Sequence, residues 1–120
     1  MNTITDIVQA HGYQSVHDMD IGDHIKVEQD HQMPLTIEKI GDNRLSVAHY
    51  YTQRGDLMSD PEIVFRLDGD EWIPVRYTQH PHIHQHDEDG LTSISTFITT
   101  WDRNLRQQGY LNAATAGGDS

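Results

Sequence analysis

Residues 45–65, LSVAHYYTQRGDLMSDPEIVF, decide the fold that the sequence predicts. In the first half of this stretch, apolar and polar side chains alternate with a period of two, as in a half-buried strand. The side chains expected to share one face are those of Leu45, Val47, His49 and Tyr51. A polar connection over residues 52–61 follows, and positions 63, 65 and 67 then alternate again. The stretch therefore predicts two neighbouring strands of an antiparallel sheet.

The flanking segments extend this sheet. Residues 25–28 and 35–38 also alternate apolar with polar side chains, and the glycine and Asx residues at 41–43 indicate a turn into the central stretch. Asp-Gly-Asp at 68–70 is typical of a hairpin turn, after which residues 72–77 return as another strand. We expect an antiparallel meander of about five strands.

Helices are expected to cover the sheet. Residues 3–11 place apolar side chains on one helical face, with Thr3 as the expected N-cap. Residues 91–109 repeat apolar side chains every three or four positions, which is typical of an amphipathic helix packed on a core. The sequence thus predicts an α+β fold. We expect a single domain over residues 1–111 and a flexible tail over residues 112–120.

The charge is strongly acidic and uneven. The 120 residues include 19 acidic and 8 basic ones, a formal net charge of −11. Residues 1–30 and residues 68–89 each hold six acids against one base. The acids expected to meet a partner are Asp18, Asp20, Asp23, Asp68, Asp70, Glu71, Asp87, Glu88 and Asp89. The alternative is that they only keep the surface solvated. Nucleic acid is excluded as a direct partner, because phosphate binding needs clustered bases and these are scattered.

Missing residue types narrow the function further. The chain has no cysteine, which excludes a disulfide scaffold, a thiolate metal site and a cysteine nucleophile. No apolar run approaches the roughly 18 residues of a membrane span, and the first residues lack the pattern of a signal peptide. We therefore expect a soluble intracellular protein with no membrane partner.

Four histidines, His80, His82, His84 and His86, alternate with other residues. In a strand, residues two apart face the same side, about 6.5–7 Å from one another, so the four imidazoles would line one face. Zinc or nickel would suit them, with a carboxylate from residues 87–89 completing the shell. Two alternatives stay open: adventitious capture of such ions and a polar edge strand without metal. We expect no dedicated cofactor.

The central stretch also holds side chains with catalytic or ligand-binding chemistry. The candidates for one end of the hairpin are His49, Tyr51, Gln53, Asp56, Asp60 and Glu62. An imidazole, a phenol and carboxylates suffice for acid–base catalysis or for a divalent ion. In the structural alternative, residues 55–56 make the turn and the aromatic side chains pack on the core. We favour this alternative and assign no catalytic residue, because the chain lacks HExxH, GxSxG and a phosphate-binding glycine loop.

The same stretch carries a family resemblance. The matching motifs are SVAHYY at 46–51, GDLM at 55–58, DPE at 60–62 and the pair Trp72 and Pro74, followed by the helix around Trp101. Over residues 34–110 the chain resembles a family of unknown function found in phages, plasmids and conjugative elements. The resemblance implies cargo of a mobile element, acting in the cytoplasm of a bacterial host. The four alternating histidines depart from the family pattern.

Three functions follow as hypotheses. The first is a small acidic inhibitor of a host defence complex, such as a CRISPR effector or restriction enzyme, whose carboxylates occupy a surface meant for nucleic acid and whose Tyr50 and Tyr110 anchor the contact. The second is a nucleotide, small-molecule or metal binder, as a sponge or an enzyme, with a cleft lined by His49, Tyr51 and Glu62 beneath the helix at residues 91–108. The third is a purely structural accessory domain. A homodimer is left open.

Overall fold

The computed structural model describes residues 1–28, 33–79 and 83–118, with only the backbone at 51–53, 56–60, 83 and 115–118. The strands are β1 (His24–Val27), β2 (Leu35–Gly41), β3 (Arg44–Gln53), β4 (Asp56–Asp68), β5 (Glu71–Gln79) and β6 (Ile83–His86). The helices are α1 (Asn2–Ala10), α2 (Ser95–Gln107) and α3 (Tyr110–Gly118), with 3₁₀ turns η1 (Val16–Asp18) and η2 (Thr92–Ile94).

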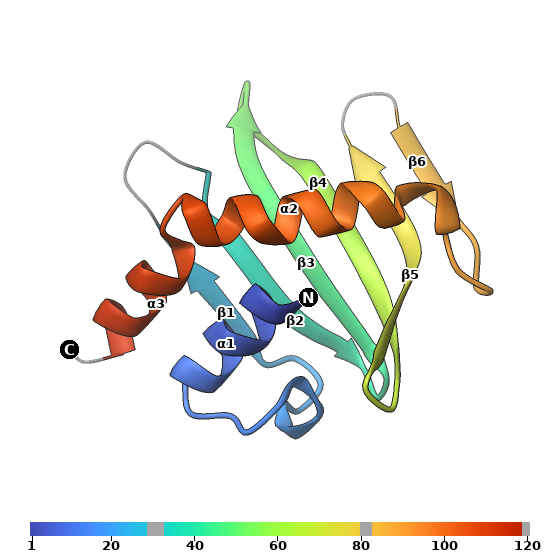
Figure 1. Ribbon diagram of the computed structural model, residues 1–120. Coiled ribbons are helices and arrows are strands. Elements are labelled where there is room, and N and C mark those ends of the chain that lie inside the picture. Colours follow the sequence, from blue (N-terminus) through green and yellow to red (C-terminus); the bar gives the residue numbers. More distant parts are fainter. Residues whose placement is uncertain (29–32, 80–82, 119–120) are drawn as a thin grey trace.

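The strands form one open sheet in the order β1-β2-β3-β4-β5-β6, and every neighbouring pair is antiparallel. The predicted α+β fold and the meander are confirmed. The described residues contain six strands rather than about five, because β6 adds an edge strand within the histidine-rich segment. Figure 1 shows the sheet with its helices lying across it.

The predicted polar connection over residues 52–61 is wrong. Strands β3 and β4 continue through it, with Gln53 paired to Asp56 across a two-residue turn at Arg54 and Gly55. Both turn residues have positive φ, 54° and 85°, as a type I′ hairpin requires. Arginine is an uncommon residue at such a position, and the acidic residues that follow are uncommon in strands. For these reasons local propensity did not predict the hairpin.

Helix α2 confirms the predicted amphipathic helix, although its first turn is the separate 3₁₀ turn η2. It lies across β3, β4 and β5 (Figure 1), and its buried side chains are Trp101 and Leu105. Gly109, with φ 90°, ends this helical run, and α3 begins at the next residue. The sequence did not predict α3, because its small residues resemble a tail, yet Ala114 is buried beside α1 and the sheet.

Helix α1 confirms the short N-terminal helix, but the predicted cap is wrong. The helix begins at Asn2, so Thr3 lies inside its first turn, and the N-cap residue Met1 makes no side-chain capping bond. Thr3 is fully buried; its backbone N–H donates to Asp102 Oδ1 at 2.9 Å and its hydroxyl donates to the Asp102 carbonyl at 3.0 Å. These bonds connect α1 to α2, so the Thr3 hydroxyl makes a contact between helices and does not cap its own helix.

The three helices lie on one side of the sheet, which we call the covered face; the opposite side is the open face. The hydrophobic core lies on the covered face, and its strand residues include Ile25, Ile37, Val47, Ile63 and Phe65. The intervening positions, including Ser46, Tyr50, Glu62 and Arg76, carry polar groups on the open face. None of the helices in the described ranges is long and apolar enough to cross a membrane.

Candidate functional site

Acids from the first predicted acidic segment and from the start of the second, residues 68–71, lie at one end of the sheet. The His17 ring Nε2 lies 2.9 Å from the carbonyl oxygen of Gly69, in the turn between β4 and β5. The Leu67 N–H donates to the Asn43 carbonyl at 2.7 Å, so the turn between β2 and β3 lies beside it. We call this surface the acidic end; its exposed acids are Asp18, Asp20, Asp42, Asp68, Asp70 and Glu71. Segments some 50 residues apart in sequence thus share one surface.

A buried lysine holds the first of these segments in place. Lys39 is 2% exposed, and its Nζ donates to the carbonyls of Val16 at 3.0 Å and Met19 at 3.2 Å. The backbone adds two bonds, from Gly22 N–H to the Lys39 carbonyl and from Lys39 N–H to the Asp23 carbonyl. Because a buried ammonium needs such acceptors, the loop around η1 is attached to β2 through its own carbonyl groups.

Asp23 contributes to the acidic end mainly as a structural residue. Its Oδ2 accepts hydrogen bonds from the Tyr13 hydroxyl at 3.1 Å and from the Asp20 N–H at 3.0 Å. Two apolar side chains that the sequence analysis missed stand beside it: Ile21 is 61% exposed and Ile40 is 39% exposed. Each directly adjoins a residue of the Gly22–Lys39 backbone bond, so both belong to the acidic end. Ile21 lies in the loop after η1, whereas Ile40 lies near the end of β2.

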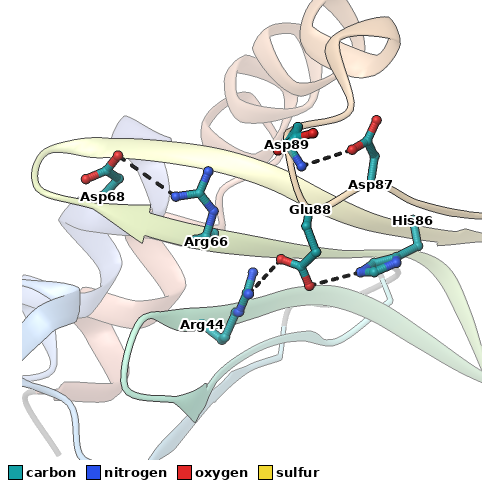
Figure 2. Close-up of polar contacts among 7 residues, drawn as sticks. All are labelled: Arg44, Arg66, Asp68, His86, Asp87, Glu88 and Asp89. Atoms are coloured by element: carbon teal, nitrogen blue, oxygen red, sulfur yellow. Dashed lines mark hydrogen bonds and ion pairs between the residues drawn. The ribbon is translucent and has the colours of Figure 1, made fainter.

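The end of the second acidic segment, residues 87–89, lies above the open face instead. Figure 2 shows Glu88 between Arg44 and His86: its Oε2 is 2.7 Å from Arg44 Nη2 and its Oε1 is 3.2 Å from His86 Nε2. The hydrogen bond from Arg44 lowers the pKa of Glu88. Asp87 accepts the Asp89 N–H at 2.9 Å, which closes the loop. The predicted acidic residues therefore do not form one continuous surface, and the charge of Glu88 is balanced by its ion pair with Arg44.

The central motif divides between the two faces. His49 is buried on the covered face, with its ring 5.5 Å from that of Trp101 and 5.3 Å from that of Tyr110. Glu62 lies on the open face, where Oε2 accepts from Ser46 Oγ at 3.0 Å. The predicted cleft lined by both His49 and Glu62 is therefore wrong. Glu62 pairs with Ala48, the residue before His49, and side chains of successive strand residues point to opposite sides of the sheet. The side chains of Tyr51, Gln53, Asp56 and Asp60 lie outside the described residues.

On the open face, Tyr50 and Glu62 form a polar network. The Tyr50 hydroxyl donates to Glu62 Oε2 at 3.1 Å, and Arg76 Nη2 lies 3.6 Å from Glu62 Oε1. Burial together with the negative charge of Glu62 raises the pKa of Tyr50 to about 12. The phenol therefore keeps its proton near neutral pH and acts as a donor to the carboxylate. This arrangement fits structural pairing better than a general base.

The four alternating histidines lie only partly within the described residues. His80 and His82 lie outside them, whereas His84 and His86 lie on the edge strand β6. His84 Nδ1 is 2.9 Å from the Thr78 hydroxyl, and His86 pairs with Glu88. In the part of the chain that the structure describes, no three histidine or acidic side chains are grouped as metal ligands. The zinc or nickel site stays a prediction.

A cavity of about 220 Å³ lies between α2 and the covered face. Its lining residues are Met33, His49, Pro61, Gln79, Phe97, Trp101, Asn104, Gln108 and Tyr110. The sequence analysis named His49 as a site residue but missed the carboxamides of Gln79, Asn104 and Gln108. The signal for two of them was their spacing, since residues three and seven positions after Trp101 share its helix face. Tyr110, predicted as an exposed anchor, is wholly buried, and its hydroxyl donates to the Met33 carbonyl.

The comparisons with known proteins give a family and no function. The chain belongs to the family DUF6908, described as a domain of unknown function, whose model matches residues 2–111. The match includes α1, the whole sheet and α2, and so the whole acidic end and the cavity beneath α2. Neither the curated proteins nor the solved structures contain a match to this chain.

Proposed function

We propose that this DUF6908 protein is a small acidic inhibitor, carried by a phage or another mobile element, that binds a basic surface of a host defence complex. The observation that supports this proposal best is the acidic end, where exposed carboxylates from the η1 loop and two hairpin turns lie together. The net charge of −11 adds to it. The sequence resemblance to a family found in phages, plasmids and conjugative elements supports an origin in a mobile element. An inhibitor of a host defence complex would act in the cytoplasm of a bacterial host.

The mechanism is competition for a groove that normally binds nucleic acid. Clustered carboxylates attract a surface lined by Lys and Arg, which accelerates association and makes it sensitive to salt. Ile21 and Ile40 provide apolar contact within the charged surface. While the acidic end occupies the groove, DNA or RNA is excluded from it. This function requires no catalytic residue.

The test is a gel-shift competition with purified CRISPR effectors and restriction enzymes, at about 50 and 500 mM salt. We expect the protein to displace DNA from its target at the lower salt and to lose affinity at the higher one. If no effector loses DNA binding at low salt and none co-purifies with the protein, the proposal is wrong.

Three charge-reversed variants locate the surface. Asp18→Lys with Asp20→Lys alters the η1 loop, and Asp70→Lys with Glu71→Lys alters the turn between β4 and β5. If these segments form one surface, each pair weakens competition by about tenfold or more. The control pair, Glu28→Lys with Asp89→Lys, changes the net charge equally outside the acidic end and leaves competition nearly intact. Equal weakening by all three pairs would show that net charge alone acts.

A further inference from the structure

The cavity beneath α2 differs chemically from the acidic end. Its ring-bearing side chains include Phe97 and Trp101, which stack at 6.0 Å and 23°. His49 from β3 adds a third ring, 5.5 Å from Trp101. Phe97 is 38% exposed, whereas Trp101 is 7% exposed, so the stack runs from the surface into the interior. Stacked rings beside a cavity are suited to a planar ligand.

Carboxamides form the polar part of the same cavity. Gln79 comes from the end of β5, Asn104 from the last turns of α2 and Gln108 from the C-cap of the same helix. No hydrogen bond joins the Asn104 side chain to another of the described residues, so its amide is available to a ligand. A carboxamide offers one donor and one acceptor side by side, which matches the paired acceptor and donor on the edge of a nucleobase.

The described residues around the cavity carry no fixed charge. None of those that line it is Lys, Arg, Asp or Glu. Arg103 and Arg106 of α2 instead line the separate hollow beside α1, where Arg106 pairs with Asp6. A phosphate group in the cavity would therefore lack a counter-charge, and a volume of about 220 Å³ is smaller than that of sites for drug-sized ligands. The chemistry favours an uncharged, planar and small ligand.

We infer that this cavity binds a nucleobase, as a free base or a nucleoside, through stacking on Phe97 and Trp101 and hydrogen bonds to the Asn104 carboxamide. The second hypothesis of the sequence analysis was a small-molecule site that included Glu62. The present inference specifies the class of ligand, and a carboxamide takes the place of Glu62 as the polar group. It does not depend on the acidic end. A failure of either idea leaves the other intact.

Calorimetry with adenine, adenosine, cytosine and AMP tests the inference on the full chain, with indole as a planar ligand that lacks the paired base edge. We expect saturable binding of at least one free base or its nucleoside, quenching of Trp101 fluorescence in a Trp72→Phe background, and no gain for AMP. The inference is overturned if no base or nucleoside binds at about millimolar concentration, if indole binds as tightly as the bases, or if AMP binds about tenfold more tightly than adenosine.

Variants on α2 identify the recognising groups. Asn104→Leu removes the free carboxamide and should weaken binding of the base by about tenfold, whereas indole has no edge to lose. Gln107→Leu, an exposed neighbour outside the cavity, is the matched control and should bind as the parent protein does. Phe97→Leu removes the outer ring at a partly exposed position, so folding is preserved, and it should weaken the bases too. Unchanged affinity in both Asn104→Leu and Phe97→Leu would refute this site.

Discussion

The covered and open faces of the sheet take alternate residues of one motif and use them for different chemistry. His49 points into the core among the rings of Trp101 and Tyr110, whereas Tyr50, its neighbour in sequence, donates to Glu62 on the other side. A run such as HYY looks like one chemical cluster in the sequence. In a strand it supplies two surfaces that never meet, so the motif is not a single site.

The faces also differ in what stabilises them. The covered face is held by burial of large apolar side chains, which contributes most of the folding free energy. The open face is held by hydrogen bonds and ion pairs at partly exposed positions, which contribute little individually, together with the small buried side chains of Ala48 and Val64. Substitutions at neighbouring positions of one strand should therefore have very different effects.

The largest effect is expected at Phe65. Its ring is 1% exposed and packs edge-on against Trp72 at 5.3 Å, so Phe65→Ala should lower the free energy of unfolding by about 3–5 kcal/mol. The next residue, Arg66, lies on the open face with a 3.9 Å ion pair to Asp68, and Arg66→Ala should cost less than about 1 kcal/mol. Urea unfolding measures both. Similar losses for the pair would contradict the division into faces.

The second prediction concerns Lys39, which connects the covered face to the acidic end. Lys39→Met keeps the length of the side chain but leaves the carbonyls of Val16 and Met19 without their donor, at a cost of about 1–3 kcal/mol. Hydrogen exchange should accelerate over residues 16–23 more than in the core strands. Lys26→Met is the control, because Lys26 is exposed and its ion pair among the described residues is with Glu28, itself exposed. If residues 16–23 keep their protection in Lys39→Met, the lysine does not hold the loop.

The sequence predicted the meander, both amphipathic helices and the inward position of His49, because periods of 2 and 3.6 record which side of an element is buried. It missed whatever depends on long-range contact. Nothing local shows that His17 meets Gly69 or that Thr3 bonds Asp102, a residue 99 positions away. The positive φ of Arg54 likewise runs against local propensity. In α3 the alanines favour a helix, but Gly117 and Gly118 do not, so the segment resembled a tail.

The third prediction uses pH to separate the two faces. Tyr50 has a pKa raised to about 12, so its proton stabilises the fold fully below pH 10, and this contribution is lost as the pH rises from 10 through 12. Tyr50→Phe removes the hydrogen bond to Glu62, at a cost of about 1 kcal/mol near neutral pH. Its stability should then fall less steeply than that of the parent protein between pH 10 and 12.

A second tyrosine, on the covered face, also contributes to the loss of stability at alkaline pH. Tyr110 also has a pKa raised by burial, so Tyr50→Phe leaves part of the alkaline loss in place. Thermal unfolding followed from pH 8 to 12 measures the slope. If Tyr50→Phe and the parent protein lose stability in parallel over this range, the Tyr50–Glu62 pair is not the group that titrates on the open face.

The smallest effect is expected at Arg44, at the edge of the open face. Its hydrogen bond to Glu88 is the main cause of the lowered pKa of that carboxyl, so in Arg44→Ala the pKa of Glu88 should rise toward its ordinary value. A lowered pKa in the folded state stabilises the fold above the ordinary value and stops doing so as the pH falls through the lowered one. Because Glu88 is exposed, salt should reduce this contribution in the parent protein and change little in the variant.

Carbon-detected NMR titration of the Glu88 carboxyl measures this shift directly. Arg66→Ala is the matched control, since it removes the neighbouring arginine and leaves the Arg44–Glu88 pair intact (Figure 2). The remaining contact, from His86 Nε2 to Glu88 Oε1, predicts that the pKa of Glu88 in Arg44→Ala stays somewhat below its ordinary value. If Arg44→Ala leaves the titration unchanged while His86→Ala moves it, then the histidine holds Glu88. The loop at residues 87–89 would then be attached through His86 and through the backbone bond from the Asp87 N–H to the Val75 carbonyl of β5, and not through Arg44.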